Sequence, residues 1–394
     1  MPEISPRLTG INEGGDDGWG VFYKARRMKA DGIDVTELTI GEHDIRTDPA
    51  ILDAMHAAAR GGHTGYAMIP GVAALRQRVA DRIRNRTGVA TTQANVLITP
   101  GGQAGLFAAH VAACPPGRRA LYIDPYYATY PGTLRAAGAQ AVAIPTRSED
   151  GFLPDPAAVD AAAAQGAASL LINSPNNPTG VVYPDTTLRA LADICTDRDL
   201  WLISDEVYDT QVWQGTHLSP RALPGMADRT LVIGSMSKSH AMTGSRIGWI
   251  VGPEPAIAAL IDLATTTTYG VPGFIQDAAL FALDQGTAFE ARIAEPFRRR
   301  RDAVLDVIAR QQIVRAIPSS GAMYLMLDIR ATGLSGQDFA LHLLDSHRIA
   351  VMPGESFGRS AAGHLRVALT VADDRLVQAV ETLCAFAAKA AISA

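Results

Sequence analysis

The chain has 394 residues, of which 47% are hydrophobic and 19% are charged, and its formal net charge is −5. A chain of this length can bury the cores of two domains, and the composition is that of an ordinary soluble globular protein. The negative net charge gives no support for nucleic acid or an anionic membrane as a partner.

The cysteines and the first residues of the chain give further information on the class of protein and its location. The three cysteines, Cys114, Cys195 and Cys384, are few and scattered, so they indicate neither a disulfide framework nor a metal site. The first residues lack the apolar core of a signal peptide, and no apolar run reaches membrane length. We therefore expect a cytoplasmic location.

Two helices are predicted in the first hundred residues. Asp48 is a good N-cap, Pro49 fits the first turn, and Gly61 with Gly62 ends that helix. A second helix is predicted over 72–86. It carries five arginines, which we interpret as a solvated face: Arg76, Arg78, Arg82, Arg84 and Arg86.

Five short apolar runs in the middle of the chain each end in a loop rich in chemically useful residues. Strands that alternate with helical stretches predict a mostly parallel sheet, and ligands bind beyond the carboxyl ends of such strands. All five loops are then expected to meet at one edge of the sheet. The predicted strands are 96–99, 120–123, 169–172, 201–203 and 230–233.

The C-terminal third predicts a smaller unit with both helices and strands. A long helix over 289–310 leads into it. Strands are predicted over 323–329 and 364–369, with a helix over 337–346 between them. The fold class is therefore α/β, with a mostly parallel central sheet flanked by helices and a second, smaller α/β domain.

The loop after the strand at 230–233 is the most informative part of the sequence. It places Lys238 among hydroxyls, including Ser235 and Ser237, and Arg246 follows eight positions after the lysine. A lysine there can form an imine with an aldehyde cofactor, while hydroxyls and an arginine can hold that cofactor's phosphate. Taken alone, a lysine is more often a solvated surface charge.

A different chemistry is compatible with the same residues. Ser235 and Lys238 match the Ser-x-x-Lys motif of penicillin-binding enzymes, in which the serine is the nucleophile. That short motif needs a Lys-Thr-Gly partner, and the chain contains none. A Ser-Lys hydrolase therefore stays a minor alternative, as does a ligand-binding protein without catalysis.

Two other loops offer groups that an aldehyde cofactor with a phosphate and a pyridine ring requires. Backbone N–H groups of Gly101, Gly102 and Gln103 at a helix start form an anion site. The spacing matches neither the dinucleotide nor the P-loop motif, and an ordinary turn is the alternative. Asp205, at a buried strand end, can pair with a protonated pyridine nitrogen, although such a residue is also a common helix cap.

Three further side chains fit around the same ring. Tyr208 and Asn177 can donate hydrogen bonds to a phenolate oxygen, and Tyr127 can stack on the ring face. Arg366, within a strand-like run, needs an anion if it is buried, and a carboxylate suits its planar fork. Gly41 can present its backbone to that carboxylate. The structural alternatives are a turn at Asn177, a core tyrosine and a structural ion pair.

Together these motifs resemble the class I and II pyridoxal-phosphate (PLP) aminotransferases, which have the aspartate-aminotransferase fold, or fold type I. The resemblance runs from about residue 35 to residue 370, in family order. It implies that Lys238 is the Schiff-base lysine, that Asp205 pairs with the ring nitrogen, and that Arg366 anchors the α-carboxylate. It implies phosphate contacts for Ser235, Ser237 and Arg246, and contacts to the ring for Asn177, Tyr208 and Tyr127.

The resemblance also implies an assembly and a domain division. Tyr66 matches a tyrosine that reaches the phosphate of the partner subunit, so a homodimer with shared active sites is expected. The small domain of the family is discontinuous. We therefore expect an N-terminal arm with part of the small domain at 1–46, a large cofactor-binding domain at 47–290, and the rest of the small domain at 291–394.

The expected activity is transfer of an amino group between an L-amino acid and a 2-oxo acid by a ping-pong mechanism. Strict dicarboxylate members bring an arginine to the stretch that reads Thr265 to Gly270 here, and this stretch has none. A neutral or aromatic substrate is therefore slightly favoured, with Trp19, Phe22 and Tyr269 as candidate walls. An aspartate/glutamate aminotransferase and a PLP-dependent C–S lyase are the alternatives.

Overall fold

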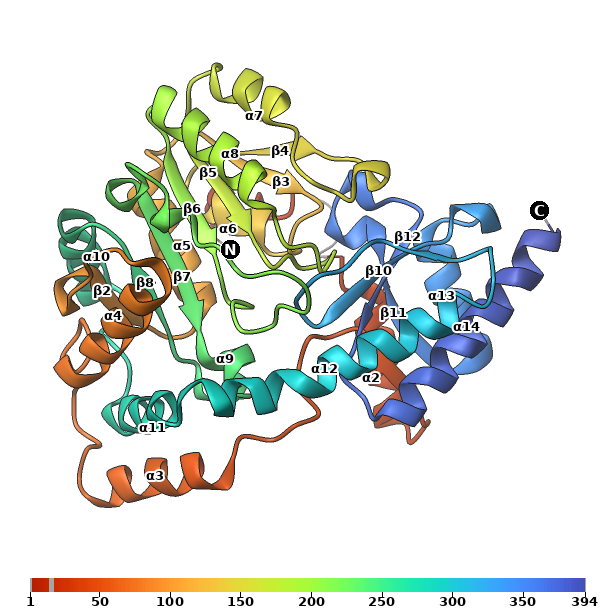
Figure 1. Cartoon of the computed structure of the whole chain (residues 1–394), viewed down its shortest axis with the longest axis horizontal. Coiled ribbons are helices and arrows are strands. Elements are labelled where there is room, and N and C mark those ends of the chain that lie inside the picture. The colour runs from red at the N-terminus through yellow and green to blue at the C-terminus, as the bar shows by residue number, and fades with distance from the viewer. Residues whose placement is uncertain (1, 14–17, 394) are drawn as a thin grey trace.

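The structure is a computed structural model that describes residues 2–13 and 18–393. Residues 14–17, which directly precede the part of the chain that contains Trp19 and Phe22, lie outside the described residues. Two sheets organise the described chain (Figure 1). The larger sheet has the order β2-β8-β7-β6-β5-β3-β4. Its strands in that order are Val96–Thr99, Gly248–Val251, Thr230–Ser235, Trp201–Asp205, Ala167–Asn173, Arg119–Asp124 and Gln140–Pro145.

The predicted parallel sheet is confirmed. Among the described strands of the large sheet, only β8 runs antiparallel to its neighbours, so the five predicted strands all point the same way. Their carboxyl ends therefore lie along one edge of the sheet. The strands β4 and β8 were not predicted.

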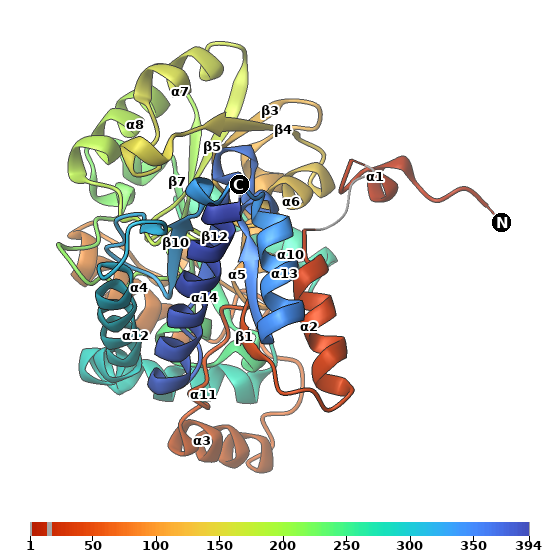
Figure 2. The same ribbon diagram turned by 90° about the vertical axis from the view of Figure 1, so that its right-hand side faces the viewer.

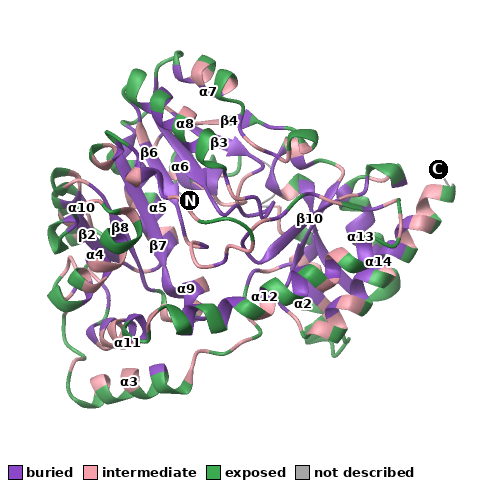
Figure 3. Ribbon diagram, in the orientation of Figure 1, coloured by how far each residue is buried: buried purple, intermediate pink, exposed green. Residues whose placement is uncertain are grey.

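Alternate residues of these strands face opposite layers of helices, because side chains of a strand alternate between the two faces. Leu121 and Leu170 pack toward α7 and α8, whereas Tyr122 and Leu171 pack toward α5 and α10. Buried strands between partly exposed helices are visible in Figure 3. The helices of these two layers are α5 Gly102–Ala113, α6 Tyr130–Ala136, α7 Pro156–Ala163, α8 Asp185–Asp197 and α10 Glu254–Thr266.

The helices predicted in the first hundred residues form as expected. α3 (Pro49–Arg60) begins at Asp48, whose carboxylate accepts a hydrogen bond from the Ala50 N–H at 3.0 Å. α4 (Ala73–Thr87) ends at Gly88, which has a left-handed φ of 72°. Both helices pack against α11 (Gly273–Asp284) near the β2 edge of the large sheet.

The smaller sheet has the order β1-β11-β12-β10-β9 and draws on both ends of the chain. Its first strand comes from the N-terminal part and pairs in parallel with β11. This composition agrees with the expected discontinuous small domain, whose exact boundaries stay a prediction. The strands in that order are Thr36–Leu38, Ile349–Pro353, His364–Ala368, Tyr324–Asp328 and Arg315–Ala316.

Helices cover the small sheet and connect it to the large one. α12 (Gly286–Ile308) runs from beside α11 to the small sheet, and α2 (Gly20–Ala30), α13 (Gly336–His347) and α14 (Asp373–Ser393) pack around that sheet (Figure 1). Figure 2 shows the short α1 (Pro6–Thr9) standing out at the side of the molecule. No helix of the described chain is both long and apolar enough to span a membrane.

The prediction of a solvated arginine face on α4 is wrong for Arg82. Its side chain is only 10% exposed and pairs with Asp209 at 3.2 Å and with Glu290, a residue of α12. Arg86 pairs with the same two carboxylates. Sequence periodicity placed the arginines on a helix, but the partners come from segments more than a hundred residues away.

This buried cluster gives a stability prediction. Replacing Arg82 by Met keeps the apolar stem but leaves Glu290, which is buried, without one of its two cations. We expect a loss of about 3 kcal/mol in the free energy of unfolding, measured by urea denaturation. Arg78 on the same helix pairs with Asp284 at the exposed surface, so Arg78→Met is the control and should lose less than about 1 kcal/mol. Equal losses for the two variants would contradict the assigned burial.

Candidate active site

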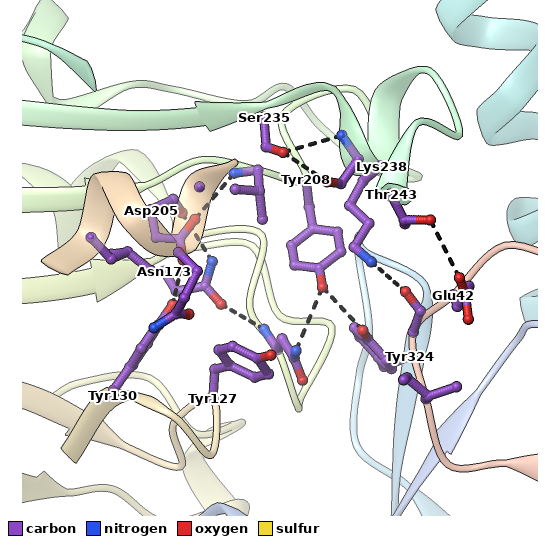
Figure 4. A pocket seen from close by; sticks show the side chains of 18 of the residues that line it. Glu42, Tyr127, Tyr130, Asn173, Asp205, Tyr208, Ser235, Lys238, Thr243 and Tyr324 are labelled. Carbon is purple, nitrogen blue, oxygen red and sulfur yellow. Dashed lines mark hydrogen bonds between the residues drawn. The ribbon is translucent and has the colours of Figure 1, made fainter. Parts of the chain in front are cut away.

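A cavity of about 300 Å³ lies where the carboxyl ends of the large-sheet strands face the small sheet (Figure 4). One wall comes from the helix start at Gly102, from Asp205 at the end of β6 and from Ser235 at the end of β7. The opposite wall comes from Tyr324 of β10 and Arg366 of β12. The cavity therefore forms only when both sheets are in place.

The structure brings together nearly all the residues that the sequence singled out. Of the residues predicted to bind the cofactor or the substrate carboxylate, only Gly101 and Tyr66 do not line the cavity. Of the three candidate wall residues, Trp19 lines it, whereas Phe22 and Tyr269 do not, so the prediction is wrong for these two. The predicted binding residues that line the cavity are Gly41, Gly102, Gln103, Tyr127, Asn177, Asp205, Tyr208, Ser235, Ser237, Lys238, Arg246 and Arg366.

Lys238 lies in the short helix α9 (Met236–Ser239) directly after β7. Its Nζ donates a hydrogen bond to the backbone carbonyl of Gly41. Burial lowers the pKa of Lys238 to about 8, because the charged form loses its hydration. Glu42 opposes this shift, whereas Arg366 and Arg246 add to it. A lysine with a lowered pKa carries a larger share of neutral, nucleophilic amine at neutral pH.

Asp205 is a buried carboxylate on the other side of the cavity. Burial raises its pKa to about 6. The Tyr130 hydroxyl donates to one oxygen at 2.7 Å and the Val207 N–H donates to the other at 3.3 Å. No cation pairs with this carboxylate within the described residues, so it is suited to a positively charged group entering the cavity.

The loop after β2 and the turn that contains Arg246 form an anion-binding corner. Gly101 has a φ of +81°, and a Cβ there would meet the Arg246 guanidinium at 2.5 Å, so only glycine fits. The first N–H groups of α5 have no helical partners and carry the positive end of the helix dipole. Ser235 and Ser237 line the same part of the cavity. Gly101 thus belongs to this corner although it does not line the cavity.

Arg366 is fully buried beside two aromatic rings. Its guanidinium lies 4.5 Å from the Tyr324 ring centre and 4.4 Å from that of Phe357. Nη1 donates to Asn177 Oδ1 at 2.9 Å, Nη2 donates to the Thr39 carbonyl, and Nε has no hydrogen-bond partner in the described chain. A buried guanidinium without an anion is energetically unfavourable, so this geometry suits an incoming carboxylate.

Tyr208 and Tyr127 lie within the cavity as predicted. The Tyr208 hydroxyl shares a hydrogen bond with that of Tyr324 at 3.0 Å and accepts one from Asn177 at 3.5 Å. Tyr127 packs edge-on against Tyr130, with ring centres 5.7 Å apart. Burial raises the pKa of Tyr208, so its hydroxyl stays protonated and can donate.

Tyr66 lies outside the cavity of its own chain. Its side chain is 91% exposed and contacts the ring of Tyr269 edge-on at 5.2 Å. Phe22 does not line the cavity either, but its ring contacts that of Trp19 at 5.7 Å. An aromatic residue with this exposure is available for contact with another chain.

Several residues that line the cavity were not predicted from the sequence. Tyr130 follows Tyr127 by three positions, and its N–H donates to the Tyr127 carbonyl at 2.8 Å in the turn before α6, so this short spacing was a usable signal. Tyr324 gave no signal, because its role depends on a contact with Tyr208 across 116 positions. Glu42 directly follows the Gly41 that was singled out, and it lines the cavity too.

The contacts of Ser235 and Lys238 do not support the alternative of a Ser-Lys hydrolase. The Ser235 hydroxyl caps α9 by accepting from the Ser237 N–H at 3.1 Å and donates to the Ser237 hydroxyl at 3.0 Å. Lys238 Nζ instead bonds to Gly41. The serine therefore lacks the lysine contact that would activate it as a nucleophile.

Comparison with known proteins decides the family. Residues 33–383 match the family described as aminotransferase class I and II. The chain belongs to this family. Arginine–pyruvate transaminase of Pseudomonas aeruginosa is 41% identical to it over 98% of both chains. Aspartate/prephenate aminotransferase of Thermus thermophilus is 35% identical over 92% of this chain and 93% of the relative.

The solved structures agree on the fold of this aminotransferase. Aspartate aminotransferase of Thermus thermophilus with maleate has a TM-score of 0.91 and 33% identity, covering 98% of this chain and 100% of the other. Aromatic aminotransferase of Pyrococcus horikoshii has a TM-score of 0.87 and 28% identity, covering 93% and 99%. The expected aspartate-aminotransferase fold and the expected transferase activity are confirmed.

The lowered pKa of Lys238 gives a pH prediction. Bound small molecules are first removed, and the protein is then treated with a limiting amount of an acetylating reagent that reacts with amines. The rate of acetylation of Lys238 should rise with pH, with a midpoint near its pKa of about 8. A free lysine has its midpoint at about 10.4. Peptide mass spectrometry at each pH measures the rate at this one site. Glu42→Gln should move the midpoint to lower pH, because the Glu42 charge stabilises the ammonium form. A midpoint above 10 would contradict the burial of the amine.

Proposed function

We propose that this aminotransferase uses pyridoxal phosphate to move an amino group between an L-amino acid and a 2-oxo acid by a ping-pong mechanism. The observation that carries the proposal is one cavity that combines an amine of lowered pKa, a buried carboxylate without a cation, an anion corner and a buried guanidinium. The first three groups match the aldehyde, the pyridine nitrogen and the phosphate of this cofactor. The fourth matches a substrate carboxylate.

Each group of the cofactor has residues of this chain that fit it. Lys238 would hold the aldehyde carbon, and Asp205 would hold the protonated ring nitrogen. Ser235, Ser237, Arg246 and the backbone of Gly101, Gly102 and Gln103 would hold the phosphate. Tyr208 and Asn177 would donate to the phenolate oxygen, with Tyr127 against the ring. When bound, the cofactor supplies an electron-poor ring that weakens the bonds at the substrate α-carbon.

The chain's own groups then bind the substrate and move its proton. Arg366 binds the α-carboxylate, which fixes the orientation of the bonds at the α-carbon. Lys238 Nζ, in its neutral form, accepts the α-proton as a general base. The lowered pKa of Lys238 favours this role at neutral pH, because the neutral form is the acceptor. Asn177 holds Arg366 through its hydrogen bond at 2.9 Å.

The substrate preference follows from the charges around the cavity. The cations that line it in the described chain are Lys238, Arg246 and Arg366, and each already has a role. No further cation is left for a distal carboxylate, so we propose a substrate without one. The sequence slightly favours a neutral or aromatic side chain. The names of the relatives differ on this point, with arginine in one case and aspartate in others.

The cofactor and its lysine can be tested together. Purified protein should be yellow, or become so on addition of pyridoxal phosphate, and borohydride should remove the colour. Peptide mapping should then find the reduced cofactor covalently attached to Lys238. Lys238→Ala should lose at least about a thousandfold in amino transfer, because covalent attachment and proton transfer both disappear. A colourless protein that gains no colour with pyridoxal phosphate would falsify the proposal.

We propose further that the active protein is a homodimer with shared active sites. Tyr66 supports this arrangement, since it is exposed on its own chain and contacts the ring of Tyr269, and the nearby residue Met68 is exposed as well. The resemblance to the family assigns Tyr66 to the phosphate of a second subunit. Closed two-fold symmetry would then place two copies of Tyr66 in two equivalent sites.

Mixing two inactive variants tests the shared site. In a mixed dimer of Lys238→Ala and Tyr66→Ala, one site carries both defects and the other carries neither. Random pairing should restore about a quarter of the sites, measured as amino transfer after the variants are unfolded and refolded together. Separate refolding followed by mixing at low temperature is the control. Activity that stays at the level of the separate variants, with sedimentation as a monomer, would contradict the dimer.

A further inference from the structure

The charges around the cavity are unequal once the proposed roles are assigned. In the described chain its lining holds the cations Lys238, Arg246 and Arg366 and the carboxylates Asp205 and Glu42. Under the proposed function, four of these five face the cofactor or the α-carboxylate. Glu42 is the charge that remains without a role.

Glu42 is firmly placed beside the reactive amine. The preceding residue, Gly41, accepts the hydrogen bond from Lys238 Nζ, and the following residue, His43, bonds through Nε2 to the Lys238 carbonyl at 2.9 Å. Both neighbours of Glu42 are therefore tied to Lys238. Its Cα cannot move away from the amine without breaking these contacts, although its side chain is exposed.

The carboxylate of Glu42 has little to bind in the described chain. The Thr243 hydroxyl donates to it at 3.4 Å, which is a long hydrogen bond, and no ion pair to it occurs among the described residues. Figure 4 shows Lys238 between Asp205 on one side and Glu42 with Thr243 on the other. Glu42 thus stands on the side away from the proposed pyridine nitrogen, toward solvent.

The cavity that Glu42 lines also has apolar surface, which suits a long side chain with an apolar stem. Ile40, which precedes Gly41, and Trp19 both line the cavity, and the rim has the exposed Glu42. An aromatic face attracts a cation and also packs against methylene groups. A carboxylate pairs best with a guanidinium, whose donors match its two oxygens.

We propose that Glu42 binds the cationic end of the substrate side chain, so that the preferred amino donor carries a guanidinium or ammonium group at the end of a flexible chain. This inference rests on the proposed function, because it takes the α-carboxylate to lie on Arg366. It replaces the neutral side chain expected from the sequence with a basic one. It keeps the earlier conclusion that a distal carboxylate has no partner here.

Binding of unreactive analogues tests the inference without catalysis. 5-Guanidinopentanoate and 5-ureidopentanoate have the carboxylate for Arg366 and lack the α-amino group, and they differ in the charge at the far end. Calorimetry with the cofactor-loaded enzyme should show the guanidinium compound binding about tenfold more tightly, as expected for one charge-assisted contact. In Glu42→Gln the two compounds should bind within about twofold of each other. Equal binding to the unmodified enzyme would overturn the inference.

The kinetic test uses L-arginine and its neutral isostere L-citrulline with pyruvate as acceptor. The ratio of their kcat/KM values should be about ten in the unmodified enzyme and close to one in Glu42→Gln. Glu381→Gln makes the same change at an exposed site on α14 and should keep the ratio. Taking the ratio separates side-chain binding from the effect of Glu42 on Lys238, because that effect acts on every amino acid alike.

Reversing the charge at position 42 tests the inference through a gain of activity. Glu42→Lys should lower the reaction of L-arginine and raise that of L-2-aminoadipate, which carries a distal carboxylate. A wild-type enzyme that prefers methionine or phenylalanine to arginine, or a Glu42→Gln variant that slows arginine and citrulline equally, would overturn the role of Glu42. Absence of amino transfer from every amino acid would instead overturn the proposed function itself, and the inference with it.

Discussion

Two cations of the cavity, the buried Arg366 and the partly buried Lys238, are held by one short stretch of backbone. Arg366 donates to the Thr39 carbonyl and Lys238 donates to the Gly41 carbonyl, while the Thr370 hydroxyl donates to the Ile40 carbonyl at 3.2 Å. Carbonyl groups compensate only part of the hydration that a buried cation loses. The cavity therefore holds unbalanced positive charge, and the anions that complete it are those of ligands.

This stretch also explains how the two sheets cooperate. It leaves β1 of the small sheet and runs past the lysine turn of the large sheet before α3 begins. His43 contacts the Lys238 carbonyl and Thr47 donates to the Ala241 carbonyl at 2.6 Å. Gly41 has no side chain at the closest point, where a Cβ would clash with the Tyr324 hydroxyl. The relative position of the two sheets therefore sets the position of Lys238 and Arg366 in the cavity.

The two carboxylates of the cavity differ in their exposure to solvent. Asp205 is buried without a cation, and burial raises its pKa to about 6, so a cationic ring nitrogen would stabilise its ionised form. Glu42 keeps contact with solvent and stabilises the charged form of the neighbouring Lys238. One carboxylate is thereby suited to a fixed partner inside the cavity. The other is suited to a partner that arrives and leaves with each turnover.

The sequence by itself determined the local elements and the reactive groups. Asp48 with Pro49 specified the start of α3, and apolar runs that end in glycine, asparagine or aspartate specified strands and their loops, because these signals depend on neighbouring residues alone. The parallel direction of those strands then required Lys238, Asp205 and Gly102 to meet at one edge. The edge strand β4 and the short β8 were not predicted, although each carries an apolar run.

Only the tertiary structure decided which groups face one another across long sequence separations. The burial of Arg82 depends on Glu290, the pairing of Tyr208 depends on Tyr324, and the surroundings of Glu42 depend on how the segment after β1 crosses the lysine turn. A residue's type shows what it can bind, but its desolvation and its partners are properties of packing. For that reason the sequence predicted the reactive groups of the cavity. Only the folded chain showed that the Glu42 carboxylate has no ion-pair partner among the described residues.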